Sequence, residues 1–232
     1  MPENNQPKIF ALVLAAGIGS RMASHFPKQY MIIEGRTMLE HSVNALLKEP
    51  RIERLVVVLS PTDMIGMGLT FDDPRVEIAR IGGNTRAMSV KNGLAYLAGE
   101  NGVWVLVHDA ARPCVVTADV KNLIDTCLKN QQGGLLASPL SDTLKFSSSD
   151  QTVDKTIPRD HIWAAQTPQF FPLDKLYDAL SHPNEKITDE SSAMESVGEH
   201  PLLVKGSPFN IKVTRPEDLD FAKTIIHFTN GQ

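Results

Sequence analysis

The chain lacks several features that would place it in a specialised class of proteins. It has only two cysteines in 232 residues, Cys114 and Cys127, and they match no metal-binding pattern. A disulfide-rich secreted scaffold is therefore excluded, and we expect reduced thiols and a cytoplasmic location. No apolar run approaches the ~20 residues that span a bilayer. Residues 1–8 are polar, so we also expect no signal peptide.

An excess of positive charge is also missing. The net charge of −4 argues against broad contact with nucleic acid or with a membrane surface, although a local basic pocket is compatible with it. At 42% hydrophobic residues, the chain can bury the core of one larger domain. We find no internal repeat, linker or low-complexity tract, and we predict a single domain over residues 1–232.

Strand-like apolar runs alternate with helical patterns over the first 139 residues. The runs typical of strands lie at residues 9–14, 55–59, 76–81, 103–107 and 134–139. The patterns with one apolar face, typical of helices, lie at residues 37–48, 89–98 and 118–129. This alternation predicts right-handed crossovers and an α/β fold, with a mainly parallel twisted sheet covered by helices on both faces.

The alternation fails after residue 139. Short strand-like runs at 143–146 and 153–157 surround a polar turn, which predicts a β-hairpin. It is either an exposed surface hairpin or an arm, about residues 139–165, that packs on a second subunit. An isolated two-stranded hairpin is only marginally stable in water, which favours the arm. Further on we predict helices at 173–180 and 189–197, strands at 202–204 and 210–213, and a capping box at 214–217 that opens a last helix.

A small-residue loop with two cations follows the first predicted strand. It reads Ala15-Ala16-Gly17-Ile18-Gly19-Ser20-Arg21, and Lys28 comes shortly after it. Consecutive N–H groups in such a turn bind anions, so the loop indicates a nucleoside triphosphate site. The dinucleotide fingerprint is absent because Met22 stands at its third glycine, and the P-loop motif is absent too. The alternative is a tight turn with solvated cations.

Other polar residues follow the later strands. Gly82-Gly83-Asn84 leads to Ser89, His108-Asp109 leads to Arg112, and Lys212 lies in the predicted strand at 210–213. Ligands bind at the carboxyl ends of strands in open α/β sheets, so these residues form one phosphate-and-metal constellation. Each has a plainer interpretation: Asp109 as a turn residue, Arg112 as its ion-pair partner, His108 as a packed histidine, and Lys212 and Arg159 as surface cations.

Seven blocks of sequence carry a resemblance to a known family. They are Leu14-Ala15-Ala16-Gly17-x-Gly19-x-Arg21-Met22, Pro27-Lys28-Gln29-Tyr30, Gly82-Gly83, His108-Asp109-Ala110-Ala111-Arg112-Pro113, Gln166-Thr167-Pro168-Gln169, Thr188-Asp189-Glu190 and Asn210-Ile211-Lys212-Val213-Thr214. Together they resemble the 2-C-methyl-D-erythritol 4-phosphate cytidylyltransferase family, over about residues 9–226. The resemblance implies a Rossmann-like nucleotidyltransferase fold with a protruding β-arm that swaps across a homodimer.

The resemblance also implies a role for each site residue. The catalytic residues would be Arg21, Lys28, Arg159 and Lys212. The CTP-binding residues would be Leu14, Ala15, Ala16, Gly17, Ile18, Gly19, Gly82, Gly83, Asn84 and Ser89. The acceptor-binding residues would be Asp109, Ala110, Arg112, Thr143, Thr167 and Thr188, with Thr143, Arg159 and Thr167 supplied by the partner's arm region. Asp109 would also bind Mg²⁺ or another divalent cation, directly or through water.

Three positions depart from the family pattern. Leu14 stands where proline is more usual, Ser20 where a second basic residue is, and Asn84 where an acidic residue is. Ser20 and Asn84 therefore alter the expected contacts to the triphosphate and the ribose, but the main cations are retained.

The implied activity joins CTP to 2-C-methyl-D-erythritol 4-phosphate and releases pyrophosphate, in non-mevalonate isoprenoid synthesis. The partners would be CTP, a polyol phosphate and a second copy of the chain, without nucleic acid or membrane. A related cytidylyltransferase acting on ribitol 5-phosphate would share the same CTP loop. The alternatives from other classes are a nucleotide-binding regulator without turnover, which the full set of cations disfavours, and a dinucleotide-dependent oxidoreductase, which Met22 disfavours.

Overall fold

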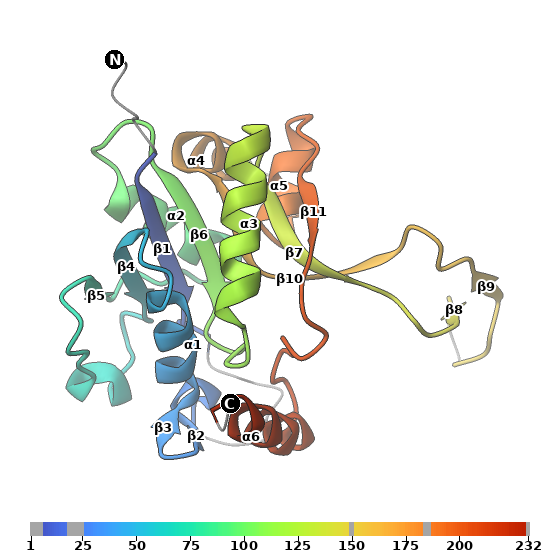
Figure 1. Ribbon diagram of the computed structural model, residues 1–232, viewed down its shortest axis with the longest axis horizontal. Coiled ribbons are helices and arrows are strands. Elements are labelled where there is room, and N and C mark those ends of the chain that lie inside the picture. The colour runs from blue at the N-terminus through green and yellow to red at the C-terminus, as the bar shows by residue number, and fades with distance from the viewer. Residues whose placement is uncertain (1–6, 18–25, 149–150, 183–186, 231–232) are drawn as a thin grey trace.

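A seven-stranded sheet forms the centre of the computed structural model, which describes residues 7–17, 26–148, 151–182 and 187–230 (Figure 1). Its strands are β1 (Ile9–Leu14), β4 (Ile52–Val58), β5 (Val76–Ala79), β6 (Trp104–Asp109), β7 (Gly134–Pro139), β10 (Trp163–Pro172) and β11 (Leu202–Lys205). Their order is β11-β7-β10-β6-β1-β4-β5. Every neighbouring pair is parallel except the two that β10 makes with β6 and β7. The predicted mainly parallel α/β sheet is confirmed.

Helices cover both faces of the sheet, as predicted. One face packs against α1 (Met38–Leu47) and α3 (Thr117–Asn130), and the other against α2 (Arg86–Leu97), α4 (Leu173–Ser181) and α5 (Glu190–Ser196). The alternation of side chains along β1 explains both contacts. Ala11 and Val13 belong to the first apolar cluster, whereas Phe10 and Leu12 belong to the second.

The last helix, α6 (Pro216–Asn230), lies outside these two layers. It packs with the small hairpin of β2 (Ile32–Ile33) and β3 (Arg36–Thr37) through a third cluster that includes Val213 and Ala222. Its start differs from the predicted capping box. Asp218, and not Glu217, accepts hydrogen bonds from the backbone N–H groups of Thr214 and Arg215. Within the described ranges, none of the helices is long and apolar enough to cross a bilayer.

The structure differs from the predicted strands in two places. β10 is absent from the prediction, because Pro168 and the polar residues beside it interrupt the apolar run; a register shift between Ala165 and Gln169 lets the strand accommodate them. The strand predicted at residues 210–213 is wrong. Those residues form a loop in which Val213 donates to the carbonyl of Ala111, so Lys212 is held by loop contacts rather than by a ladder.

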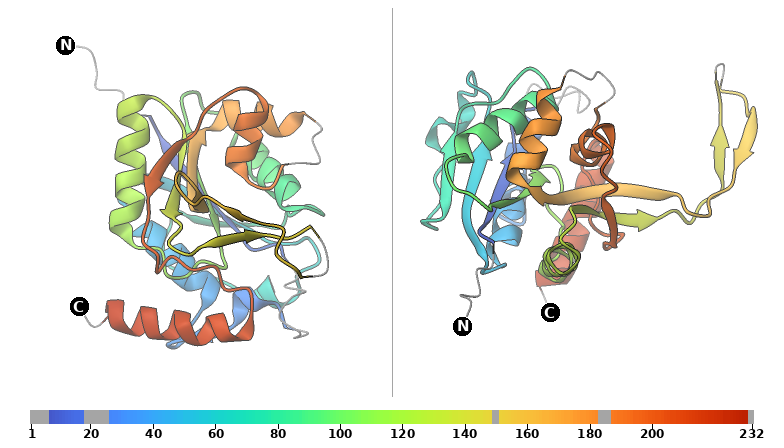
Figure 2. Two further views of the ribbon diagram at one scale, coloured as in Figure 1. Left: turned by 90° about the vertical axis from the view of Figure 1, so that its right-hand side faces the viewer. Right: turned by 90° about the horizontal axis from the view of Figure 1, so that it is seen from above.

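A hairpin lies where the alternation breaks down. β8 (Leu144–Phe146) and β9 (Lys155–Ile157) pair with each other in a separate two-stranded sheet. Figures 1 and 2 show this sheet at the end of a long projection that β7 and β10 begin. Phe146 and Val153 are exposed on it. The hairpin therefore buries little apolar surface within its own chain.

Candidate active site

A pocket of about 480 Å³ lies at the carboxyl ends of β1 and β6. The residues that line it are Leu14, Ala16, Gly17, Lys28, Ser60, Gly83, Asn84, Thr85, Arg86, Ser89, Asp109, Ala111 and Lys212. Many of the predicted CTP-binding residues are therefore brought together with both predicted catalytic lysines, Lys28 and Lys212. The parallel pairing of β1 with β6 explains the convergence, because it places Leu14 opposite Asp109 at one edge of the sheet.

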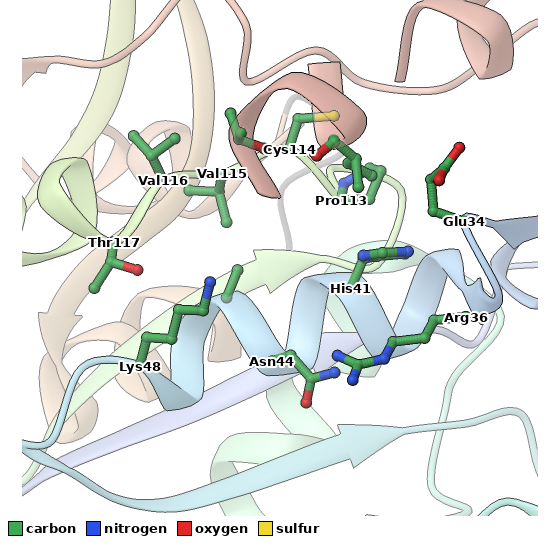
Figure 3. A pocket seen from close by; sticks show the side chains of 13 residues that line it. Glu34, Arg36, His41, Asn44, Lys48, Pro113, Cys114, Val115, Val116 and Thr117 are labelled. Atoms are coloured by element: carbon green, nitrogen blue, oxygen red, sulfur yellow. Dashed lines mark hydrogen bonds between the residues drawn. The ribbon is translucent and has the colours of Figure 1, made fainter. Parts of the chain in front are cut away.

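A larger cavity of about 590 Å³ lies elsewhere, between α1, α6 and residues 113–117 (Figure 3). Arg36, His41 and Lys48 are among its lining side chains, and none of the predicted site residues is. Choosing the cavity with the larger volume would therefore assign the active site to the wrong place. The convergence of glycines, cations and one carboxylate identifies the smaller pocket as the candidate active site.

The loop after β1 forms one wall of this pocket. The N–H of Ala15 donates to Val58, and its carbonyl accepts from the side chain of Gln29, which fixes the start of the loop. A Cβ atom at Gly82 would lie only 2.4 Å from the Cβ of Ala16, so the two loops meet only because residue 82 is glycine. The predicted residues Ile18, Gly19 and Arg21 lie outside the described residues.

The loop that precedes α2 forms another part of the pocket's lining. The hydroxyl of Ser89 is buried; it accepts from the N–H of Gly83 and donates to the carbonyl of Thr85. Thr85 in turn caps the helix by accepting from Met88. Asn84 is exposed at the rim. Ser89 thus shapes the loop, and Gly83 and Asn84 line the pocket beside it.

Two lysines from distant parts of the chain supply positive charge. Lys28 stands in a short 3₁₀ helix (Lys28–Tyr30), and its Nζ donates to the carbonyl of Val213 at 2.8 Å. Lys212 Nζ lies 2.6 Å from Oδ2 of Asp109, with 41% of its side chain exposed. The loop that carries Lys212 is therefore tied to both the β1 segment and the end of β6.

Asp109 belongs to a buried ion-pair cluster that the sequence reasoning missed. Arg86 donates through Nε to Oδ1 of Asp109 at 3.0 Å, and its two terminal nitrogens donate to the carboxylate of Glu190 at 2.6 and 3.0 Å. Burial alone would raise the pKa of Asp109, but the charges of Arg86 and Lys212 hold that pKa well below its usual range. Arg86 follows the Gly82-Gly83 block and Glu190 ends the Thr188-Asp189-Glu190 block, yet only the fold shows that the two side chains form an ion pair beside Asp109.

A neutral histidine lies beneath Asp109. Burial lowers the pKa of His108 to about 4. Its Nδ1 accepts from the hydroxyl of Thr167 at 3.0 Å, and its Nε2 donates to the carbonyl of Arg112 at 3.1 Å. The Thr167 oxygen also accepts from the N–H of Asp109. The plainer interpretation of His108 as a packed residue is confirmed. The placement of Thr167 in the partner's arm is wrong, because Thr167 is buried in the body of its own chain.

Arg112 anchors the Lys212 loop rather than pairing with Asp109. Its guanidinium donates to the carbonyls of Asn210 at 2.6 Å and Ala165 at 3.2 Å, while its Nε has no hydrogen-bond partner among the described residues. Asn210 is fully buried and donates to the carbonyl of Thr167. Ala110 is buried away from the pocket and accepts from Ser42; its neighbour Ala111 lines the wall instead.

Comparison with known proteins identifies the family. The family model described as 2-C-methyl-D-erythritol 4-phosphate cytidylyltransferase matches residues 9–228. The chain belongs to this family. Enzymes of that name from Photorhabdus laumondii and Vibrio parahaemolyticus are 49% and 45% identical to it; the matches cover 93% of both chains in the first case and 100% in the second. A crystal structure of 4-diphosphocytidyl-2C-methyl-D-erythritol synthase, 36% identical, matches with a TM-score of 0.83 over 95% of this chain and all of that chain.

Two predicted acceptor-binding residues of this cytidylyltransferase-family chain, Thr143 and Thr188, and the predicted catalytic Arg159 do not line the pocket. Thr143 and Arg159 belong to the projection that carries β8 and β9, far from the body in Figure 1, and Arg159 donates to the carbonyl of Ser141. Thr188 is exposed just before α5, where its N–H donates to Ser192. One chain by itself therefore does not bring Thr143 and Arg159 to the glycine loop.

The pocket offers a metal ion few protein ligands. Asp109 is the one carboxylate among its lining residues, and the part of the chain that the structure describes holds no cluster of three side chains suited to a metal. Both oxygens of Asp109 already accept from cations. This donor set does not form a cage by itself, but it fits a Mg²⁺ ion bound mainly by phosphate oxygens and water.

Proposed function

We propose that this chain transfers the cytidylyl group of CTP to 2-C-methyl-D-erythritol 4-phosphate, with release of pyrophosphate, at the pocket between Lys28 and Lys212. The proposal rests on membership of the cytidylyltransferase family and on one observation in particular. Two ammonium groups from opposite ends of the chain converge on one glycine-lined pocket. Such fixed cations suit a reaction in which two anionic phosphates must approach each other.

The chemistry needs no side-chain base. The nucleophile is a phosphate oxygen of the acceptor, which already carries negative charge near neutral pH. His108 could not serve as a base, since it is buried and both ring nitrogens are engaged. Positioning and charge stabilisation therefore carry the reaction, as in phosphoryl transfer generally. Lys28 would stabilise the triphosphate, and Lys212 would orient the attacking phosphate.

The nucleotide would lie across the two small-residue loops. The backbone at Ala16, Gly17 and Gly83 leaves room for close approach, and Asn84 stands at the rim. A bound Mg²⁺ would neutralise charge on the phosphates, with Asp109 as its protein ligand. Arg21, Ile18 and Gly19 belong to the same proposal by resemblance.

The acceptor half of the site would come from a second copy of the chain. Thr143 and Arg159 lie on a projection whose hairpin is paired with nothing beyond itself in the described residues, and whose Phe146 and Val153 are exposed. A two-stranded hairpin is only marginally stable in water, so packing on a partner would stabilise it. We therefore propose a homodimer in which each arm reaches the other subunit's pocket.

The two buried free cysteines support a cytoplasmic, reducing location.

One assay tests the function and its alternatives. The purified protein is given CTP and Mg²⁺ with either 2-C-methyl-D-erythritol 4-phosphate or ribitol 5-phosphate, and pyrophosphate release is followed. Rapid release with the first acceptor alone is expected. Release only with ribitol 5-phosphate would assign the related activity, and CTP binding without release under either condition would indicate a regulator. NAD in place of CTP serves as the control for an oxidoreductase and should show no binding.

A further inference from the structure

Four side chains of alternating charge run from the interior to the pocket. They are Glu190 at the start of α5, Arg86 at the start of α2, Asp109 at the end of β6 and Lys212 in the loop before α6. We call this set the ion-pair relay. Glu190 is 1% exposed and does not line the pocket, whereas Lys212 stands at its opening. The relay thus connects the buried carboxylate of Glu190 to the ammonium group of Lys212, which lies where the substrate phosphates would bind.

The hydrogen bonds divide Arg86 between two carboxylates. Its Nη1 and Nη2 both donate to Glu190, at 2.6 and 3.0 Å, and only its Nε donates to Asp109. A guanidinium fork prefers a two-point contact with a carboxylate. While Glu190 holds the fork, Arg86 takes just Oδ1 of Asp109. The other oxygen, Oδ2, accepts from Lys212 at 2.6 Å.

We propose that Glu190 is a positioning residue that reserves one oxygen of Asp109 for Lys212 by occupying the fork of Arg86. Without the Glu190 charge, the buried guanidinium has Asp109 as its remaining counter-charge. It then turns to engage both oxygens of that carboxylate, and Lys212 loses its anchor. The inference concerns the orientation of Lys212 and rests, for its kinetic consequence, on the proposed cytidylyl transfer.

A simpler role for Glu190 is to join α5 to α2. Other contacts already hold α5 in place. Asp189 caps the helix by accepting from Ser192, and the N–H of Ser191 donates to Gln169 at 2.7 Å. A purely structural role would lower stability and reduce the amount of folded enzyme. It would not change kcat per folded site through Lys212, so the two roles predict different measurements.

The test variant is Glu190→Gln, which keeps the shape and removes the charge. Its matched control is Glu49→Gln, because Glu49 is also a buried carboxylate paired with an arginine, Arg51, and does not line the pocket. We expect Glu190→Gln to lower kcat by ~10- to 100-fold, the scale of a small misplacement of a reacting group, with much less change in the KM for CTP. Glu49→Gln should lose stability without losing kcat. An equal fall in both variants, or unchanged kcat in Glu190→Gln, would overturn the proposal.

A double variant separates action through Lys212 from a general effect. In the Lys212→Ala background, Glu190→Gln should change kcat by less than about threefold, because the group it positions is gone. A loss as large as in the wild-type background would mean that Glu190 acts on something else.

A crystal structure of Glu190→Gln makes the test independent of turnover. It should show the Arg86 fork on both oxygens of Asp109 and Lys212 released from Oδ2. A retained Lys212–Asp109 contact would refute the relay. If the wild-type protein releases no pyrophosphate, the proposed function fails, but this structural outcome still decides the positioning role.

Discussion

The Nζ atom of Lys28 lies 2.8 Å from the carbonyl oxygen of Val213, although the two residues are 185 positions apart. The contact ties the segment after the glycine loop to the loop that carries Lys212. Lys212 in turn contacts Asp109 at the end of β6. The two ammonium groups are therefore fixed relative to each other before any ligand binds, which is the arrangement that electrostatic catalysis needs.

Replacing Lys28 by alanine should remove charge stabilisation from the triphosphate. We expect Lys28→Ala to lower kcat/KM by ~10²- to 10³-fold, the usual cost of losing one preorganised donor. Lys48→Ala is the control, since Lys48 is an exposed lysine that lines the other cavity. Steady-state kinetics with CTP in excess, together with thermal unfolding, measures the effect. Near wild-type turnover in folded Lys28→Ala would disprove this role.

Lys212 should act mainly when the two phosphates meet. Lys212→Ala is expected to lower kcat far more than it weakens CTP binding, because the interaction is strongest in the transition state. Lys212→Arg should not restore full activity, as a planar fork does not replace a compact charge beside Asp109. Kinetics for both substrates and calorimetry with CTP distinguish these effects. If Lys212→Ala loses CTP affinity alone, Lys212 is a simple triphosphate clamp.

Arg159 should act on the acceptor from the partner subunit. Arg159→Ala is expected to raise the KM for the acceptor strongly and leave the KM for CTP unchanged. An equal mixture of Arg159→Ala and Lys28→Ala subunits should recover about a quarter of wild-type activity, because half of the dimers are mixed and each has one intact site. Exchange of subunits is first verified with differently tagged chains. No recovery after verified exchange would place the whole site within one chain.

His108 should make the folded state sensitive to acid. Its pKa is about 4 in the folded protein because it is buried, against 6.5 for the free group. Between pH 4 and pH 6.5 the histidine is protonated in the unfolded chain but neutral in the folded protein. The free energy of unfolding therefore falls as the pH drops through that range and increases as the pH is raised through it. The expected loss between pH 7.5 and pH 5 is ~2 kcal/mol.

Urea unfolding at the two pH values measures this loss. In His108→Asn, the fall in the free energy of unfolding between pH 7.5 and pH 5 should be smaller than in wild type by that amount. In His200→Gln, which replaces an exposed histidine, the fall should equal that of wild type. An unchanged pH dependence in His108→Asn would assign the acid sensitivity to other groups.

Local pattern was enough to predict most of the sheet and its helices. The apolar run of β1 and the one-sided apolar pattern of α3 depend on burial faces that repeat along the chain, so they can be seen without a fold. The same reasoning placed Asp109 and Gly83 at one edge, because parallel strands end together. It failed for β10, whose Pro168 and buried polar residues are stabilised by contacts with β6 and β7.

The α/β class, the glycine loop after the first strand and the types of residue in the site can all be read from the order of residues along the chain. The contacts that these residues make can be read only from the folded chain. It joined Arg86 to both Glu190 and Asp109, fixed Lys212 in a loop instead of a strand, and put Thr167 beneath Asp109 in the same chain. An ion pair between distant segments depends on where the backbone brings them, and residue spacing along the chain does not contain that information.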